Sequence, residues 1–233
     1  DVEARIIWGG DNTVNKFKTF ITKPRCIDLA FANRYSISVI DSNKLGKLNS
    51  NDLAILTKKF YNDTYTMDQF GCSSPNSVFW LGKNNVAKKK FWFELSKIVN
   101  IEYDLDLSGA NKKISNLMNY TLAKNKRFKA NIKKFNLITL KSKKLSFDNF
   151  ENINFGTFLE INLHDINHLR KYTSEKLQTV TYYGTDFKSI KKFIINNKIK
   201  GIDRIVPIGR AFDLTPEWDG VDIISTLSRT IGV

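Results

Sequence analysis

Hydrophobic and polar residues follow one another along this chain in stretches typical of strands and helices in alternation. Apolar or β-branched runs predict strands at 4–8, 35–41, 77–81, 137–140, 157–163, 177–183 and 204–208. Apolar residues at helical spacing, or capping residues, predict helices at 11–20, 52–65, 84–99, 104–134, 165–173, 186–197 and 218–230, the last with a turn at Asp219-Gly220. This alternation favours an α/β fold, a mainly parallel sheet with flanking helices.

The 233 residues contain neither an internal repeat nor a linker rich in Gly, Ser or Pro, so we predict a single domain over 1–233. No apolar run approaches the roughly 20 residues that a bilayer span needs. The first residues resemble no signal peptide, and because an initiator Met before an acidic residue is normally kept, we expect further sequence before Asp1. Two cysteines cannot form the disulfide framework of a secreted domain, which favours a reduced, cytoplasmic chain and leaves one Cys26–Cys72 disulfide open.

The chain is basic, with a formal net charge of +14 and a pI near 9.6. Such a charge suits nucleic acid or a smaller anionic ligand. The lysines, however, stand in short groups along the chain, at 88–90, 112–113, 133–134 and 141–144. We expect these groups to be solvated surface and expect no nucleic-acid partner; a basic nucleic-acid-binding domain using 112–144 stays the alternative.

One cysteine stands between glycine and small hydroxyl residues, in Phe70-Gly71-Cys72-Ser73-Ser74-Pro75, after a predicted helix and before a predicted strand. This context predicts a thiol displayed on a tight loop beside a sheet. A thiolate can attack a carbonyl or thioester, glycine allows close approach of a substrate, and backbone N–H groups after it can stabilise an oxyanion. A packed, inert thiol is the other interpretation of the motif taken alone.

Three further features carry less chemistry. The turn Trp8-Gly9-Gly10-Asp11, after a strand and before a helix, suits either an anion or an ordinary turn with Asp11 as helix cap. His164 and His168 share the i, i+4 spacing, but no Cys or His cluster supplies a third metal ligand, so we interpret them as surface residues. Cys26 is interpreted as a packed or incidental thiol.

A last segment, 208–220, combines a Gly-Arg turn at Arg210 with Trp218-Asp219-Gly220. Taken in order, the Gly9-Gly10 turn, the Cys72 loop and the stretch from Arg204 to Gly220 resemble the acyl-CoA reductase family typified by LuxC. That family is related to the aldehyde dehydrogenases, so the resemblance implies an aldehyde-dehydrogenase-like catalytic domain. The resemblance covers almost the whole chain and is weakest between 104 and 149.

The resemblance implies an NADPH-dependent oxidoreductase that takes an acyl group from acyl-CoA or an acyl-protein onto Cys72 and reduces the thioester to an aldehyde. Gly71, Ser73 and Ser74 would form the substrate and oxyanion loop, and Gly9, Gly10 and Arg210 would contact the cofactor. The family also implies long-chain acyl substrates, an acyl-transferring partner protein and a homo-oligomer when full length; short or branched acyl substrates stay open as the alternative. Bacterial luminescence is one of its settings.

The departures from the aldehyde dehydrogenase pattern are part of the same comparison. Where those enzymes carry the glutamate that activates the hydrolytic water, this chain has 30–34, Ala-Phe-Ala-Asn-Arg, which fits reduction of an acyl-enzyme in place of hydrolysis. The glutamate that holds the nicotinamide ribose is likewise absent from 153–157. From the resemblance we expect most of a dinucleotide domain to lie outside this sequence, with 1–25 and 201–233 belonging to its edge. A non-catalytic, partner-binding scaffold of the same fold is the remaining alternative.

Overall fold

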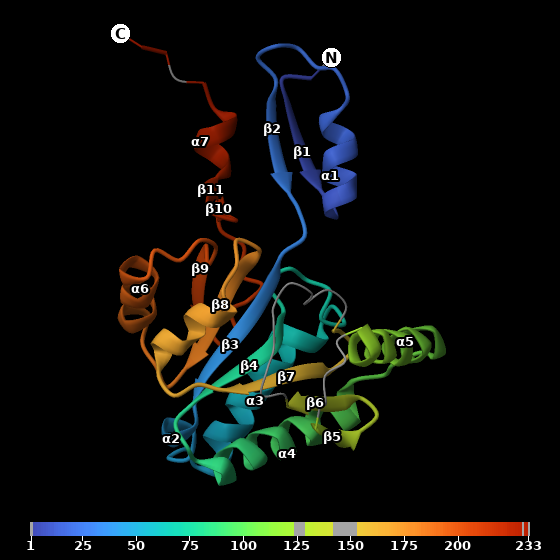
Figure 1. Ribbon diagram of the computed structural model, residues 1–233, viewed down its shortest axis with the longest axis vertical. Coiled ribbons are helices and arrows are strands. Elements are labelled where there is room, and N and C mark those ends of the chain that lie inside the picture. Colours follow the sequence, from blue (N-terminus) through green and yellow to red (C-terminus); the bar gives the residue numbers. More distant parts are fainter. Residues whose placement is uncertain (1, 124–128, 142–152, 230, 233) are drawn as a thin grey trace. The chain divides into compact units, whose positions relative to one another are not determined.

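The computed structural model describes residues 2–123, 129–141, 153–229 and 231–232 (Figure 1). The chain forms two compact units, a larger one of Tyr35–Phe212 and a smaller one of Asp1–Arg34 with Asp213–Val233. Whether the smaller unit is the edge of a cofactor domain stays a prediction.

The larger unit is built on one sheet. Its strands are β3 (Tyr35–Asp41), β4 (Pro75–Leu81), β5 (Lys129–Lys134), β6 (Leu137–Lys141), β7 (Thr157–Asn162), β8 (Leu177–Tyr183) and β9 (Arg204–Pro207). They form a seven-stranded sheet in the order β5-β6-β7-β4-β3-β8-β9. Every neighbouring pair runs parallel except β5 and β6, so the predicted α/β fold with a mainly parallel sheet is confirmed.

Helices cover both faces of this sheet (Figure 1). One face carries α2 (Ser42–Leu45), α3 (Ser50–Tyr65) and α4 (Asn85–Glu102); the other carries α5 (Leu107–Ala123), the 3₁₀ helix η1 (Ile166–Tyr172) and α6 (Phe187–Asn196). A strand buried on both faces has little need of polar residues, which explains the apolar run Val78-Phe79-Trp80 in β4. The side chains of Val78 and Trp80 join the core under α3 and α4, and that of Phe79 joins the other core.

The core under α3 and α4 is rich in aromatic rings. Phe60 of α3 is fully buried and meets Phe91 edge-on, with ring centroids 5.2 Å apart. Its ring also lies 6.1 Å from that of Trp92 and 5.5 Å from that of Phe158. Such pairs add to the free energy gained by burying the rings. Phe60 therefore anchors the helix that leads into the cysteine loop.

The predicted strands are all present, with bounds that differ by two residues or fewer. The predicted helix over 104–134 is wrong in its second half, because α5 ends at Ala123 and β5 pairs antiparallel with β6 through a turn at Phe135-Asn136. Hydrogen bonds to β6 override the weak helical pattern there. Residues 124–128 and the lysines at 143 and 144 lie outside the described residues.

The smaller unit contains β1 (Ala4–Trp8), α1 (Asp11–Lys18) and β2 (Ile27–Phe31), with β1 and β2 parallel. β2 was not predicted. The helix predicted over 218–230 is mostly wrong: β10 (Glu217–Trp218) and β11 (Val221–Asp222) form a hairpin before the short helix α7 (Ile223–Leu227). Asp219 and Gly220 both take positive φ, which the Asp-Gly hairpin turn requires.

Among the described residues, no helix is both long enough and apolar enough to cross a membrane.

We expect Phe60→Ala to lower the free energy of unfolding by about 3–5 kcal/mol, because it removes a fully buried ring and leaves a cavity between α3 and the sheet. Denaturant unfolding followed by circular dichroism measures the loss. Ile55→Ala on the exposed side of the same helix is the matched control, with an expected change within about 0.5 kcal/mol. Equal losses in the two variants would contradict this account of the core.

Candidate active site

Cys72 is exposed and lies in the loop between α3 and β4, three residues before Pro75, the first residue of β4. Because β3, β4, β7 and β8 are parallel, their first residues lie at the same end of the sheet, and the cysteine loop stands at that end. The sequence-based expectation of a thiol on a tight loop after a helix and before a strand matches this position.

A buried glutamine fastens the start of the cysteine loop. Gln69 Nε2 donates to the carbonyl oxygens of Pro75 (3.2 Å) and Thr157 (3.3 Å), and its Oε1 accepts from the N–H of Gly156 (2.7 Å). Asp68 and Gln69 both take positive φ, an uncommon conformation for residues with side chains. The N–H of Phe155 donates to Asp68 O at 3.0 Å, which joins the two turns directly.

Hydroxyl groups hold Cys72 and the two residues that follow it. Ser36 Oγ donates to the carbonyl oxygen of Cys72 (2.6 Å) and accepts from the N–H of Thr179 (3.1 Å). Ser73 Oγ donates to Gln178 Oε1 at 3.1 Å, and Ser74 Oγ donates to Asp63 O at 2.9 Å.

Ser73 and Ser74 are themselves buried, so their hydroxyls serve the loop. A contact of their backbone with substrate stays a prediction, as does that of Gly71.

The loop after β9 packs against Gly71. A Cβ atom at Gly71 would lie 2.7 Å from Cε1 of Phe212, closer than real Cβ contacts, so the ring of Phe212 occupies the space that the glycine leaves. Asp63 holds this second loop, since its carboxylate accepts from the N–H of Gly209 (2.6 Å) and of Ala211 (3.0 Å). Asp63 is almost fully buried.

Sequence reasoning missed Asp63, although a signal exists. Near the C-terminal end of a helix a carboxylate is disfavoured by the helix dipole, so an aspartate there needs another reason. The predicted residue Arg210 lies in the loop that Asp63 holds; its side chain is exposed and its carbonyl oxygen accepts from Arg204 Nη2 at 3.3 Å. The structure thus brings Arg210 and Cys72 onto neighbouring loops.

Lys113 of α5 binds the turn before β7, which Gln69 also binds. Its Nζ donates to Phe155 O at 2.6 Å and lies 5.2 Å from the ring centroid of Phe135. Burial lowers the pKa of Lys113 to about 7, because the charged amine loses its water. The ring of Phe155 in turn meets the ring of Phe70 edge-on, with centroids 5.1 Å apart, next to the cysteine motif.

The expectation that the lysine groups are solvated surface is therefore wrong at two positions. Lys113 is buried as described, and Lys88 is buried with its Nζ donating to Asn162 Oδ1 at 2.7 Å. Burial also lowers the pKa of Lys88. A nucleic-acid surface over 112–144 loses Lys113, and several of its other lysines lie outside the described residues.

The Gly9-Gly10 turn belongs to the smaller unit. Gly10, which has no side chain, is the N-cap residue of α1, and the predicted cap Asp11 is wrong: its Oδ1 accepts from the N–H of Asn33 at 3.1 Å. A Cβ atom at Gly9 would lie 2.9 Å from Thr13 Cγ2, so the close packing of the turn explains this glycine. Cys26, in the same unit, is half-buried, as expected for a packed thiol.

A comparison with models of protein families shows which family the chain belongs to. A family model described as acyl-CoA reductase (LuxC) matches residues 1–230. The chain belongs to the acyl-CoA reductase (LuxC) family. The resemblance read from the Gly9-Gly10, Cys72 and Arg204–Gly220 segments is confirmed. A comparison with curated protein sequences gives no match.

Solved structures similar to this LuxC-family chain are aldehyde dehydrogenases. They include an NAD-dependent aldehyde dehydrogenase from Sinorhizobium meliloti (TM-score 0.60, 10% identity, 93% of this chain and 45% of that one). Others are methylmalonate-semialdehyde dehydrogenase from Oceanimonas doudoroffii (0.60, 7%, 89% and 46%) and a variant of 1-pyrroline-5-carboxylate dehydrogenase from Thermus thermophilus (0.60, 8%, 88% and 43%). These likenesses confirm the aldehyde-dehydrogenase-like fold. The chain spans a little under half the length of these structures.

In the LuxC-family chain, residues 153–156 lead directly into β7. Asn154 and Phe155 are buried, and Phe155 and Gly156 take positive φ in the turn before β7. Gln69 and Lys113 bind the backbone of this turn. The segment therefore braces the cysteine loop.

We expect Gly71→Ala to destabilise the protein by about 1–3 kcal/mol, because the new methyl group overlaps the ring of Phe212. Phe212→Leu removes the overlapping ring edge, so Gly71→Ala should cost less than half as much in that background. Denaturant unfolding of the two single variants and the double variant gives the coupling free energy. An identical cost of Gly71→Ala in both backgrounds would show that the Phe212 contact is not responsible.

We also expect the stability to rise with pH between about 7 and 9.5. In this window the unfolded chain keeps the proton of Lys113, whereas the folded chain, with the pKa lowered to about 7, releases it. Each pH unit adds at most about 1.4 kcal/mol to the free energy of unfolding, and below pH 7 both states carry the proton, so the gain vanishes.

Lys113→Met should flatten this part of the stability profile, measured by denaturant unfolding at several pH values. Lys112→Met, at the exposed neighbouring position, is the control and should leave the slope unchanged. The same slope in all three proteins would rule out Lys113 as its source. The window ends near pH 9.5 because burial raises the pKa of Tyr120, so tyrosine titration of the unfolded chain enters above it.

Proposed function

We propose that this chain carries the catalytic cysteine of an acyl-CoA reductase, which converts an activated acyl group to an aldehyde through a thioester on Cys72. One observation carries the proposal: Cys72 is exposed, while Ser73 and Ser74 beside it are buried in hydrogen bonds. A fixed loop that presents a reactive group to solvent suits covalent catalysis. Membership in the acyl-CoA reductase (LuxC) family supports the reaction class.

The acyl transfer exchanges one thioester for another. The Cys72 sulfur, as thiolate, forms a bond to the acyl carbonyl carbon, and the bond from that carbon to the coenzyme A sulfur breaks. The departing sulfur takes up the proton that Cys72 has released, so atoms and charge balance. An acyl-protein donor would react in the same way.

Negative charge develops on the carbonyl oxygen during this attack. The backbone N–H of Cys72 is the donor that we propose for this oxyanion. Ser36 binds the carbonyl oxygen of the same residue, and Gln69 holds the start of the loop, so the peptide on either side of the thiol needs little rearrangement. Preorganised donors of this kind lower the barrier because they are already oriented when the charge appears.

The residues proposed for the cofactor fit parts of a nicotinamide dinucleotide. The Gly9-Gly10 turn projects no side chain, and Asp11 in the first turn of α1 disfavours a phosphate there, so the turn suits the uncharged nicotinamide end. Arg210 is an exposed residue, and a guanidinium is the side-chain group that suits a phosphate. When bound, NADPH supplies the hydride that reduces the acyl carbon.

The finer points of the proposal follow the family resemblance. We infer long-chain acyl-CoA or acyl-protein as donor, an acyl-transferring partner protein, a homo-oligomer of the full-length protein and a cytoplasmic location. The net charge of +14 supports an anionic donor such as coenzyme A. The lack of a carboxylate in 30–34 supports reduction of the acyl-enzyme over its hydrolysis.

We expect a mass increase equal to one acyl group when the protein is mixed with acyl-CoAs of different lengths, because the thiol of Cys72 is within reach of solvent. Intact-mass spectrometry with peptide mapping should place the adduct on the Cys72 peptide, and hydroxylamine should remove it. Addition of NADPH or NADH to the acylated protein, with aldehyde trapped by a hydrazine reagent, then compares the two cofactors.

Cys72→Ala should abolish the adduct with an unchanged circular dichroism spectrum, and Cys26→Ala should keep it. An adduct that survives Cys72→Ala would exclude this nucleophile. Absence of any adduct on the parent protein, when iodoacetamide still alkylates Cys72, would favour the non-catalytic scaffold.

A further inference from the structure

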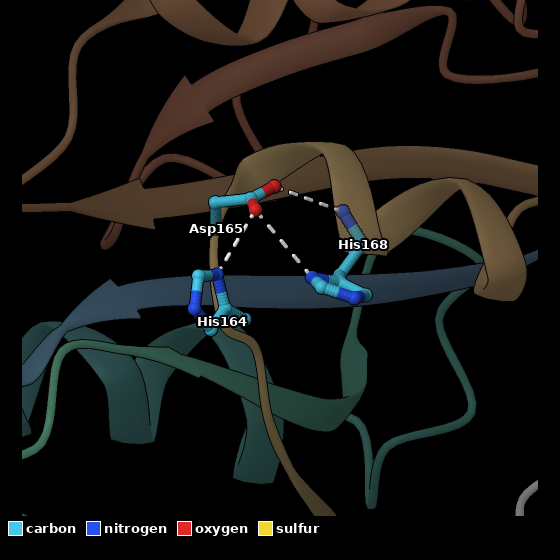
Figure 2. A group of neighbouring side chains, drawn as sticks. All are labelled: His164, Asp165 and His168. Atoms are coloured by element: carbon cyan, nitrogen blue, oxygen red, sulfur yellow. Dashed lines mark hydrogen bonds and ion pairs between the residues drawn. The ribbon is translucent and has the colours of Figure 1, made fainter.

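The two histidines of the chain meet an aspartate just beyond the end of β7 (Figure 2). Asp165 Oδ2 lies 3.2 Å from His164 Nδ1 and 3.6 Å from His168 Nδ1. One ligand atom from each of the three residues lies within 4.8 Å of the other two. The sequence offers no Cys or His as a third ligand, and the carboxylate of Asp165 fills that place instead.

The two oxygens of Asp165 face different groups. Oδ1 accepts from the N–H groups of Asn167 (2.7 Å) and His168 (3.3 Å), which begins the 3₁₀ helix η1. Oδ2 is left turned toward the imidazoles, as Figure 2 shows. Hydrogen bonds that fix a carboxylate in this way resemble the outer contacts that orient metal ligands in proteins.

His168 offers the second observation. Its Nδ1 is screened from water and makes no hydrogen bond among the described residues; the Asp165 Oδ2 contact at 3.6 Å is too long for one. A buried nitrogen without a partner costs free energy, because it has lost the hydrogen bond that water would make. The ring of His168 meets that of His164 edge-on, with centroids 5.6 Å apart, so this nitrogen is screened on the side where the three residues converge.

We propose that His164, Asp165 and His168 bind a divalent transition-metal ion of the zinc class. Two imidazoles and one carboxylate form a donor set that suits Zn²⁺. Ligand atoms at roughly 2.0–2.2 Å from a tetrahedral ion lie about 3.3–3.6 Å from one another. The distances from Asp165 Oδ2 to the two Nδ1 atoms, 3.2 Å and 3.6 Å, fall close to that range. His164 is mostly exposed, so its ring is able to rotate toward the ion.

The site is separate from the cysteine. His164 follows the end of β7, whereas Cys72 precedes the start of the parallel neighbour β4. The two residues therefore stand at opposite ends of the strands. Strands of this length put their two ends about 20 Å apart. The ion would therefore clamp η1 to the end of β7, with its fourth position open to water, and the inference does not depend on the proposed reductase activity.

The test uses the chain without a histidine tag and with Cys26→Ser and Cys72→Ser, so that neither thiol competes for the ion. Calorimetric titration with ZnCl₂ at neutral pH should give one site per chain with a dissociation constant in the micromolar range. Co²⁺ should give the visible absorption of a tetrahedral complex. His164→Ala and His168→Ala should each weaken binding at least tenfold, roughly the loss that even outer contacts of metal ligands cause.

Asp165→Asn tests the carboxylate, because asparagine keeps the cap of η1 and loses the anionic ligand; it too should weaken binding. Asp186→Asn, at the equivalent cap of α6, is the matched control and should bind Zn²⁺ as the parent does. Circular dichroism confirms that each variant is folded. Unchanged affinity after His164→Ala with His168→Ala, or no one-to-one binding at millimolar Zn²⁺, would overturn the proposal.

Discussion

The three hydrogen bonds of the buried Gln69 amide hold the cysteine loop to the sheet. The backbone at Asp68 and Gln69 is left-handed, which costs of order 1 kcal/mol at each residue with a side chain. The Gln69 side chain offsets this cost by binding the backbone of Pro75, Gly156 and Thr157 at once. The loop start, the first residue of β4 and the turn before β7 thereby become one structure. Cys72 is exposed on a loop whose start is held in this way.

A buried lysine also supports the turn before β7. The chain is strongly basic, yet α5 places the amine of Lys113 under the turn before β7, where it binds Phe155 O. The amine loses its water there, so close to neutral pH it exists in both charged and uncharged forms. The formal net charge counts this lysine as one more cation. In the structure it is a buried hydrogen-bond donor.

Local pattern was enough to predict seven of the eleven strands in the described residues, and the setting of Cys72, because these depend on residues that are neighbours in sequence. Local pattern did not predict the residues whose hydrogen bonds hold the cysteine loop. Gln69 bonds to a residue 87 positions away and Asp63 to one 148 away, and such pairs leave no trace in local spacing. The antiparallel strand β5 was missed for the same reason, since its partner strand supplies its hydrogen bonds. By contrast, the hairpin turn at Asp219-Gly220 carries its own signal, although the helix predicted around it was wrong.

The two edge strands of the large sheet bear on how the protein behaves at high concentration. An open edge exposes unpaired N–H and C=O groups, which another chain can extend into an aggregate. At one edge, β5 has three lysines among its six residues. At the other, β9 ends on Pro207, which has no N–H to offer a further strand. Both edges are thus poor templates for strand addition, so the sheet resists growth into fibrous assemblies.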